Sequence, residues 1–261
     1  MKKIYISVVS HGHGKMIRKI DSIRHLNNEF FVVIKNNCSD DIIVEYCREN
    51  NIAIIDNDYG LGFGENNNIN YLYCKHNGMK EDDFFLVLNP DLDIQVSSLK
   101  KFNSIICDSN INISTINLFI DKDYKKYDYS IRKFPTLITF ISSFLGFKNK
   151  SIIDKSNMHG IITIDWAAGS FLCFKSKVYR ELGGFNESYF MYCEDVDICY
   201  RSQKMGYGVN FISSIKATHL AQHTNRKIFN KHFYWHLKSA LRFISVKARG
   251  MRKNTKSRIL P

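Results

Sequence analysis

Short apolar runs alternate with helical segments over residues 4–88, and this alternation constrains the fold more than any other feature of the sequence. The apolar runs predict strands over 4–9, 30–34, 52–55 and 84–88, and the segments between them predict helices over 15–26, 42–50 and 65–75. Strands that alternate with helices at this spacing form βαβ units with parallel strands. The sequence therefore predicts an α/β fold with a mostly parallel central sheet.

The alternation loosens after residue 91. Strands are expected over 111–120, 161–164, 169–174, 209–212 and 215–218, with helices over 137–147, 176–182 and 195–205. This order is typical of a mixed α and β region laid against the first half. No linker or internal repeat interrupts the 261 residues, so we expect one domain over 1–225, a length that supports a single sizeable core.

Cysteine usage and hydropathy limit where the protein works. The seven cysteines are scattered and odd in number, without a Cys-x-x-Cys pair, which indicates a reducing compartment. The first apolar run is too short for a signal peptide, and no stretch of eighteen uncharged apolar residues occurs. We therefore expect a cytoplasmic protein without a membrane-spanning helix.

The positive charge is concentrated in residues 226–261, which hold eleven of the Lys and Arg residues and no Asp or Glu. On a helical wheel this segment has an apolar face and an opposite basic face, the pattern of an interfacial helix on anionic lipid. The apolar face consists of Phe229, Phe233, Leu237, Ala240, Leu241 and Ile244. The alternative is a terminal helix that packs this face on the domain. We expect residues 226–261 to bind an anionic membrane surface.

Polar residues follow the predicted strands, where ligands of open parallel sheets bind. Ser10 follows the first strand, Asn36 the second, the glycine-rich loop 60–64 the third, and Asn89-Pro90-Asp91 the fourth. Asp91 is placed to hold a divalent cation on a diphosphate, although Asn-Pro-Asp is also an ordinary turn. The asparagines that follow the glycine-rich loop suit sugar hydroxyls, a weak signal by itself.

An acidic cluster, Glu194, Asp195 and Asp197, lies between apolar and aromatic residues. Clustered carboxylates repel one another and are unfavourable when buried without partners, which favours a catalytic use. The alternative is the acidic start of a helix, where carboxylates complement the dipole. His219, after the last predicted strand, is either a metal ligand or a structural histidine.

The ordered motifs resemble those of the family 2 glycosyltransferases with the GT-A fold, and within them the bacterial O-antigen rhamnosyltransferases. The resemblance covers residues 4 to about 245 and rests on Ser10-His11-Gly12-His13, Gly62-Phe63-Gly64 with Asn66-Asn67-Asn68, Asn89-Pro90-Asp91, Tyr129 to Pro135, Asp165-Trp166 with Gly169, Gly183 to Arg201, and His219.

The resemblance implies roles for these positions. Asp195 corresponds to the general base, with Glu194 and Asp197 in support, and Asp91 and His219 to ligands of Mg²⁺ or Mn²⁺. The acceptor site corresponds to Asp165, Trp166 and Gly169. The donor site corresponds to Ser10, His11, Asn36, Asn37, Gly62, Phe63, Asn67, Asn68, Asn89, Asp91 and Arg132. One departure stands out: Lys35-Asn36-Asn37 replaces the Asp-Asn with which the family reads a pyrimidine base.

The function implied is inverting transfer of L-rhamnose from dTDP-β-L-rhamnose to the GlcNAc of an undecaprenyl-diphosphate-linked acceptor, at the inner face of the bacterial plasma membrane. Asp195 near a helix N-terminus is expected to stay ionised, as a base must. Another donor, such as UDP-galactofuranose, is the near alternative. A nucleotidyltransferase lacks its basic phosphate loop here, and a nucleic-acid-binding module leaves the acidic motifs unexplained, so no nucleic-acid partner is expected.

Overall fold

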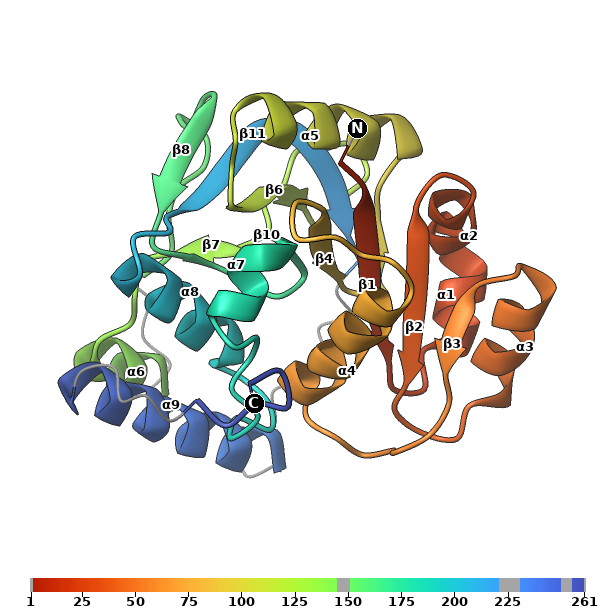
Figure 1. The fold of residues 1–261 in the computed structure, drawn as a ribbon. Coiled ribbons are helices and arrows are strands. Elements are labelled where there is room, and N and C mark those ends of the chain that lie inside the picture. The colour runs from red at the N-terminus through yellow and green to blue at the C-terminus, as the bar shows by residue number, and fades with distance from the viewer. Residues whose placement is uncertain (1, 145–150, 221–230, 250–254, 261) are drawn as a thin grey trace.

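A computed structural model describes residues 2–144, 151–220, 231–249 and 255–260, and its centre is a nine-stranded sheet with strand order β3-β2-β1-β4-β10-β6-β11-β5, with β8 paired to β11 (Figure 1). The strands are β1 (Ile4–Ser10), β2 (Phe31–Asn36), β3 (Ala53–Ile55), β4 (Phe84–Leu88), β5 (Leu92–Asp93), β6 (Ile113–Phe119), β8 (Ile161–Ile164), β10 (Phe171–Lys175) and β11 (Val209–His219). Two further short strands, β7 (Ile131–Arg132) and β9 (Trp166–Ala167), pair with each other outside this sheet.

Most of the sheet runs in one direction. Strands β3, β2, β1 and β4 are parallel neighbours, and β6 is parallel to β11. Strand β10 lies between β4 and β6 and is antiparallel to both, so β6 and β11 point the same way as β1. The mostly parallel sheet is confirmed, and the polar residues that follow β1, β2, β4 and β11 meet at one edge.

Helices cover both faces of the sheet. One face carries α4 (Phe63–His76), α7 (Ser176–Glu181) and α8 (Glu194–Lys204), and the other carries α1 (Gly14–Ile20), α2 (Ser22–Asn27), α3 (Asp41–Glu49) and α5 (Val96–Asp108). The side chains of β1 alternate between the faces: Ile4, Ile6 and Val8 join the second core, whereas Tyr5 joins the first. Period-two alternation of this kind is what a strand buried on both sides requires.

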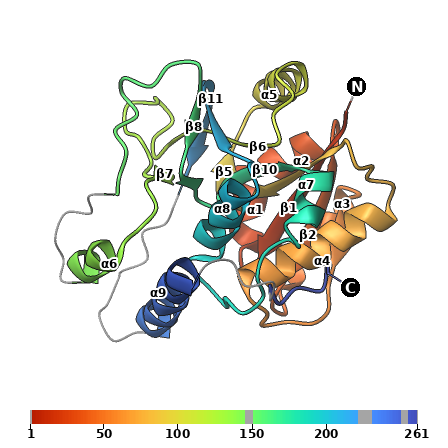
Figure 2. The ribbon, with the colours of Figure 1, turned by 60° about the vertical axis from the view of Figure 1, so that its left-hand side comes forward.

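Two helices lie beside the main layers. Helices α6 (Leu137–Phe144) and α9 (Lys231–Arg249) lie next to each other (Figure 2). The Phe140 and His236 rings are 6.1 Å apart, and Lys247 Nζ donates to the Pro135 carbonyl at 3.3 Å. Within the described part of the chain, every helix is too short or too polar to cross a bilayer. The expected domain boundary at 225 lies outside the described residues.

Several sequence expectations need correction. The expected helix 15–26 is two helices, because Asp21 adopts the left-handed φ of 58° and binds Arg24 and Tyr46 through its carboxylate. The strands expected over 209–212 and 215–218 are one strand with a shift in register. The second half does not lie against the first; its strands continue the same sheet.

Candidate active site

The site is built where strands β1, β2, β4 and β11 end. Ser10 is the last residue of β1, and its carbonyl accepts the Asn37 N–H at 2.7 Å. The Asn89-Pro90-Asp91 turn follows β4, and His219 is the last residue of β11. The Leu220 N–H donates to the Asp91 carbonyl at 3.0 Å, which fixes the end of β11 against the turn.

Asp91 and His219 face each other at this edge. His219 Nε2 lies 3.2 Å from Asp91 Oδ1, and His219 Nδ1 lies 2.5 Å from Asp128 Oδ2. Burial disfavours a charged imidazole, but the hydrogen bond to Asp128 and the negative charges of Asp91 and Asp128 outweigh it and raise the pKa of His219 to about 9. Two carboxylates thus hold a positive charge between them.

This arrangement fits a divalent cation. Asp91 Oδ1 is buried without an aligned hydrogen-bond donor, and its 3.2 Å separation from His219 Nε2 is close to the roughly 3 Å between adjacent ligands of an octahedral ion. Asp128 orients the imidazole from behind, as carboxylates commonly do for metal-bound histidines. No set of three His, Cys, Asp or Glu ligands occurs among the described residues, so a cation here would need further oxygen ligands from a diphosphate and water.

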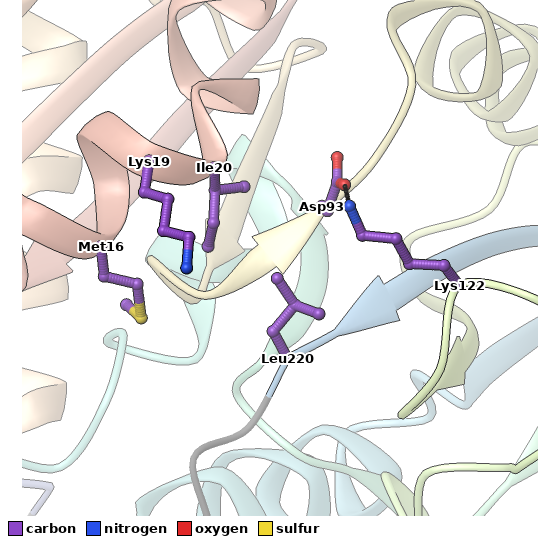
Figure 3. A pocket seen from close by; sticks show the side chains of 6 residues that line it. All are labelled: Met16, Lys19, Ile20, Asp93, Lys122 and Leu220. Atoms are coloured by element: carbon purple, nitrogen blue, oxygen red, sulfur yellow. Dashed lines mark ion pairs between the residues drawn. The ribbon is translucent and has the colours of Figure 1, made fainter.

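Asp93, two residues after Asp91, lies in a different place. Its carboxylate is 3.9 Å from Lys122 Nζ and lines a pocket of about 350 Å³ between α1 and the end of β11 (Figure 3). The other lining residues are Met16, Lys19, Ile20 and Leu220. Asp91 is therefore the carboxylate of this turn that faces His219.

Asp195 lies at the start of α8 and is half-buried. Its Oδ2 accepts the Gly169 N–H at 3.2 Å and its Oδ1 accepts the Val196 N–H at 2.8 Å. Tyr192 and Cys193, directly before the helix, both have left-handed backbones, with φ of 69° and 64°. Two consecutive non-glycine residues in this region store strain, and this turn sets the direction in which α8 begins.

Burial dominates the electrostatics of the acidic pair. It raises the pKa of Asp195, and the N–H groups of Val196 and Gly169 and the Arg132 guanidinium only partly offset it. Burial and the neighbouring Asp195 raise the pKa of Glu194 well above its ordinary value, and Glu194 Oε2 has no hydrogen-bond partner. The helix start alone therefore does not set the ionisation of Asp195. A raised pKa suits a base that must take a proton near neutral pH.

Short segments connect Asp195 to the Asp91–His219 pair. Gly169 donates to Asp195, and the carbonyl of the next residue, Ser170, accepts the Asn89 N–H at 2.9 Å. A second connection is the segment 128–132. Asp128, at one end, binds His219, and the Arg132 guanidinium, at the other, lowers the pKa of Asp195 through its positive charge. Two short chain segments therefore link the Asp195 carboxylate to the Asp91–His219 pair.

Asp197 has a different position from Asp195. Its side chain is fully buried, with Arg201 Nε at 2.8 Å and the Tyr189 hydroxyl at 3.3 Å. Arg201 also donates to the carbonyls of Leu182 and Gly184. Asp197 thus fastens α8 to the loop before it, so its expected support of Asp195 is limited to holding the helix in place.

The glycine-rich loop contacts the loop that precedes α8. Gly62 has an ordinary φ of −68°, yet a Cβ there would lie 2.6 Å from the Phe190 carbonyl oxygen. The Phe63 N–H donates to the same carbonyl at 3.0 Å, and the Phe63 ring packs on Gly169. Gly62 and Phe63 therefore connect the glycine-rich loop, which was expected to bind the donor, to the loop that leads into α8 and Asp195.

The asparagines expected to contact the donor are structural. Asn67 is fully buried between the Ser7 hydroxyl and the Phe63 carbonyl. Asn68 is equally buried, and binds Tyr179, Phe185, Glu187 and Ser257. The Asn37 amide binds both the N–H and the carbonyl of Leu61. Their hydrogen-bonding groups are used inside the protein, which corrects the expectation for these three positions.

Lys35, at the end of β2 where the family usually has an aspartate, has a structural role. Its buried ammonium donates to the backbone carbonyls of Asn36, Asn57 and Asp58 and ties the end of β2 to the segment after β3. Asn36 Nδ2 donates to Asp56 at 2.8 Å, whereas Asn36 Oδ1 is buried without a partner. Asn36 therefore keeps one free acceptor at this edge. His11 is exposed there, with Nδ1 3.2 Å from the Asn37 carbonyl oxygen.

The residues expected at the acceptor site, Asp165 and Trp166, form hydrogen bonds within the protein. Asp165 Oδ2 accepts the Phe134 N–H at 2.7 Å, and the Trp166 indole N–H donates to the Lys133 carbonyl at 3.0 Å. Trp166 is only 9% exposed, and the Arg132 guanidinium lies 5.8 Å from its ring centre. The indole therefore offers little surface to an acceptor sugar, contrary to its expected place in the acceptor site.

Two charged residues near the site gave no signal in the sequence. Asp128 sits in a charged loop without periodicity, 91 positions from the histidine it orients. Lys155 is buried beside Ser130 and the Leu118 carbonyl, and burial lowers its pKa to about 8. Neither residue belongs to a recognisable motif, since each acts through a partner distant in sequence.

Comparison with known proteins identifies the family. No family model matches the chain. It is 35% identical over 246 residues to rhamnosyltransferase WbbL of Escherichia coli (strain K12), which covers 94% of this chain and 93% of that protein. It is 33% identical over 82 residues, 31% of this chain and 27% of the other, to N-acetylglucosaminyl-diphospho-decaprenol L-rhamnosyltransferase of Mycobacterium tuberculosis (strain CDC 1551 / Oshkosh).

Solved structures share the fold at low identity. The crystal structure of GalNAc-T7 with UDP, GalNAc and Mn²⁺ matches 94% of this chain and 48% of its own, with a TM-score of 0.64 and 13% identity. Residues 1–349 of S. aureus TarS with UDP-GlcNAc match 97% of this chain and 68% of their own, with a TM-score of 0.58 and 16% identity. With the relation to WbbL, the chain belongs to the family 2 glycosyltransferases of the GT-A fold, among the bacterial rhamnosyltransferases.

Proposed function

We propose that this glycosyltransferase moves L-rhamnose from dTDP-β-L-rhamnose to the GlcNAc of a polyprenyl-diphosphate-linked acceptor, with inversion at the anomeric carbon. The observation that carries the mechanism is the connection of Asp195 to the Asp91–His219 pair through Gly169 and Ser170. The sugars are those suggested by the names of the related rhamnosyltransferases.

An inverting transfer is a single displacement. The acceptor hydroxyl oxygen forms a bond to the anomeric carbon while a base on that side takes its proton, and the bond to the nucleoside diphosphate breaks on the opposite side. Asp195 is the proposed base, because its carboxylate is held by two backbone N–H groups and burial raises its pKa.

Asp91 and His219 would hold Mg²⁺ or Mn²⁺ on the donor diphosphate, and Asp128 would keep the imidazole oriented. Such a cation supplies positive charge where the leaving diphosphate gains negative charge. Asn36, with its unpartnered Oδ1, is the proposed contact to the nucleotide base, and Arg132 the proposed contact to phosphate or acceptor.

We also propose that α9 binds an anionic membrane surface, where a lipid-linked acceptor is held. Ala240 and Phe243 are buried against the domain, whereas Tyr234 and Leu241 are 64% and 58% exposed beside the exposed Lys238 and Arg242. Part of the helix thus packs on the protein, as the alternative held, and part presents apolar and basic residues together. Phe229, expected on the same apolar face, lies outside the described residues.

The test is transfer by Asp195→Asn. This variant keeps the size of the side chain but removes the base, so transfer to a polyprenyl-diphosphate-GlcNAc analogue should fall at least about a hundredfold. Binding of dTDP-rhamnose, measured by calorimetry, should stay within about twofold. Asp123→Asn, an exposed aspartate in the 121–129 loop, is the matched control.

Two results would contradict the proposal. Substantial transfer by Asp195→Asn would remove Asp195 as base. Turnover of another sugar nucleotide in a donor panel, with none of dTDP-rhamnose, would replace rhamnose by the sugar found and leave the site assignment intact.

A further inference from the structure

Residues 256–260, called the clamp segment here, lie against the start of α4 rather than along α9 (Figure 1). They also contact residues 182–193, called the base loop because it leads into Glu194 and Asp195. The Glu187 N–H donates to the Lys256 carbonyl at 2.7 Å, and the Arg258 N–H donates to Glu187 Oε1 at 3.0 Å. The clamp segment is thus hydrogen-bonded through its main chain to the base loop.

Arg258 connects two elements through its side chain. Its Nε lies 3.1 Å from Glu187 Oε1 on the base loop, and its terminal nitrogen pairs with Glu65 on α4. The Glu187 side chain is only 8% exposed, so its carboxylate would lose its cationic partner in a largely dry setting if Arg258 were removed. Losing one partner of a buried ion pair leaves the other charge uncompensated.

Apolar contacts fix the same segment. Gly184 has a φ of +64°, and a Cβ there would lie 2.4 Å from Ile259 Cδ1. A Cβ on the adjacent Gly183 would lie 2.8 Å from two atoms of the Leu260 side chain. Because Gly183 and Gly184 have no side chains, Ile259 and Leu260 can pack directly on the backbone at the start of the base loop.

The two carboxylates bound by Arg258 lie on opposite sides of a contact important to the site. On one side, Gly64 precedes Glu65; a Cβ at Gly64 would lie 2.7 Å from Phe185 Cβ and 3.7 Å from Glu194 Cβ. On the other side, Glu187 follows Phe185 by two residues. Arg258 therefore bridges the start of α4 and the base loop, next to the contact between Gly64 and Phe185.

Helix α9 holds the other end of the base loop. The Ser239 hydroxyl donates to the Met191 carbonyl at 2.9 Å, and the Phe190 and Trp235 rings are 4.8 Å apart. The strained Tyr192–Cys193 turn and Asp195 follow directly. A loop that stores strain keeps its conformation only when its surroundings determine it.

We propose that Arg258 is a positioning residue for transfer: by bridging Glu65 and Glu187 it keeps the base loop in the register that places Asp195. The proposal rests on the proposed function in taking Asp195 as the base. Small displacements of a catalytic group produce large losses of rate, so the effect should appear in kcat.

The kinetic test compares Arg258→Ala with Lys256→Ala. Both variants remove one positive charge from the clamp segment, but Lys256 contributes only its carbonyl to the base loop. Arg258→Ala should lower kcat about tenfold or more with the donor KM within twofold, whereas Lys256→Ala should match the wild type. Arg258→Lys reaches one carboxylate at a time and should restore kcat in part, and Glu187→Gln should reproduce the loss.

Hydrogen–deuterium exchange of the same variants, without substrates, gives a readout independent of activity. Amides of residues 183–193 should exchange faster in Arg258→Ala than in Lys256→Ala, because the bridge no longer opposes local opening. Equal exchange in the two variants, or kcat within twofold of the control, overturns the proposal. If the wild type transferred no sugar, the proposed function would fail while the exchange experiment still decided on the bridge.

Discussion

At the scale of single residues, the buried carboxylate of Glu194 lowers the stability of the folded protein when it is ionised. Its carboxylate is buried beside Asp195 and has an unpartnered oxygen, an arrangement that favours the protonated form. Because its folded pKa lies above its unfolded pKa, the folded state binds the extra proton. The contribution of Glu194 to the free energy of unfolding is therefore largest below its unfolded pKa of about 4 and is lost as pH rises towards its folded pKa.

Glu194→Gln should remove this pH-dependent loss. We expect a higher thermal midpoint than the wild type at pH 8, by about 2 °C for each kcal/mol recovered in a domain of this size, and no difference near pH 4. Differential scanning fluorimetry at both pH values measures it. An equal midpoint at pH 8 would show that the carboxylate is not the origin of the destabilisation.

Asp128 acts on the site through His219. Asp128→Asn should weaken Mn²⁺ binding about 10- to 100-fold, the usual effect of losing a carboxylate that orients a metal-bound histidine. Calorimetric titration with Mn²⁺ and dTDP measures the loss. Asp123→Asn in the same loop, whose side chain is 72% exposed, should bind Mn²⁺ as the wild type does; equal affinity of both variants would remove Asp128 from the site.

The residues that the sequence located are those that carry a local signal. Asp91 follows an apolar strand and Asp195 lies in the first turn of a helix, so short motifs single out both as candidates. Asp128 and Arg258 were not found, because their partners are distant in sequence and neither lies in a periodic pattern. The asparagines of α4 were misassigned because an asparagine that follows a glycine-rich loop looks the same in the sequence whether its side chain faces a ligand or a buried polar group.

At the scale of elements, the site depends on a close contact between the glycine-rich loop and the base loop. Gly62→Ala has no conformational reason to fail, since φ is −68°, but its methyl would overlap the Phe190 carbonyl oxygen. We expect the base loop to shift and kcat to fall about tenfold or more.

Gly60→Ala is the matched control for this change. Its φ of +75° disfavours alanine, yet no atom lies within 4 Å of the added Cβ. It should lose about 1–2 kcal/mol of stability while kcat stays near the wild-type value, measured at saturating substrates and well below the thermal midpoint. A larger loss of kcat in Gly60→Ala than in Gly62→Ala would contradict the proposed contact.

The same scale shows why the first half was easier to predict. Strands β1, β2 and β3 arise from local βαβ units and lie side by side in chain order, and β4 is added in parallel on the other side of β1. Strand β10 enters antiparallel between β4 and β6, a pairing that no local pattern records. Helix α5 was overlooked although Leu99, Phe102 and Ile106 recur at helical spacing and are buried.

At the scale of the whole molecule, helices α6 and α9 lie next to each other on one side of the protein (Figure 2). Leu241 of α9 is 58% exposed, and Leu137 and Ile138 of α6 are 50% and 78% exposed. Lys238 and Arg242, on the exposed part of α9, add positive charge. Apolar groups next to basic ones are what an anionic lipid surface binds.

This side of the molecule should therefore bind vesicles. Leu241→Glu places a charge where the leucine would enter the lipid, and burying a leucine contributes about 1.5–3 kcal/mol, so binding to anionic liposomes at low salt should weaken at least about tenfold. Leu72→Glu is the matched control, because it adds the same charge at a leucine that is 40% exposed on α4. It should bind liposomes as the wild type does, because α4 is not part of the proposed membrane-binding side. Co-sedimentation separates the outcomes: equal loss in both variants would reflect net charge alone, and an absence of wild-type binding would remove the membrane from the function proposed for α9.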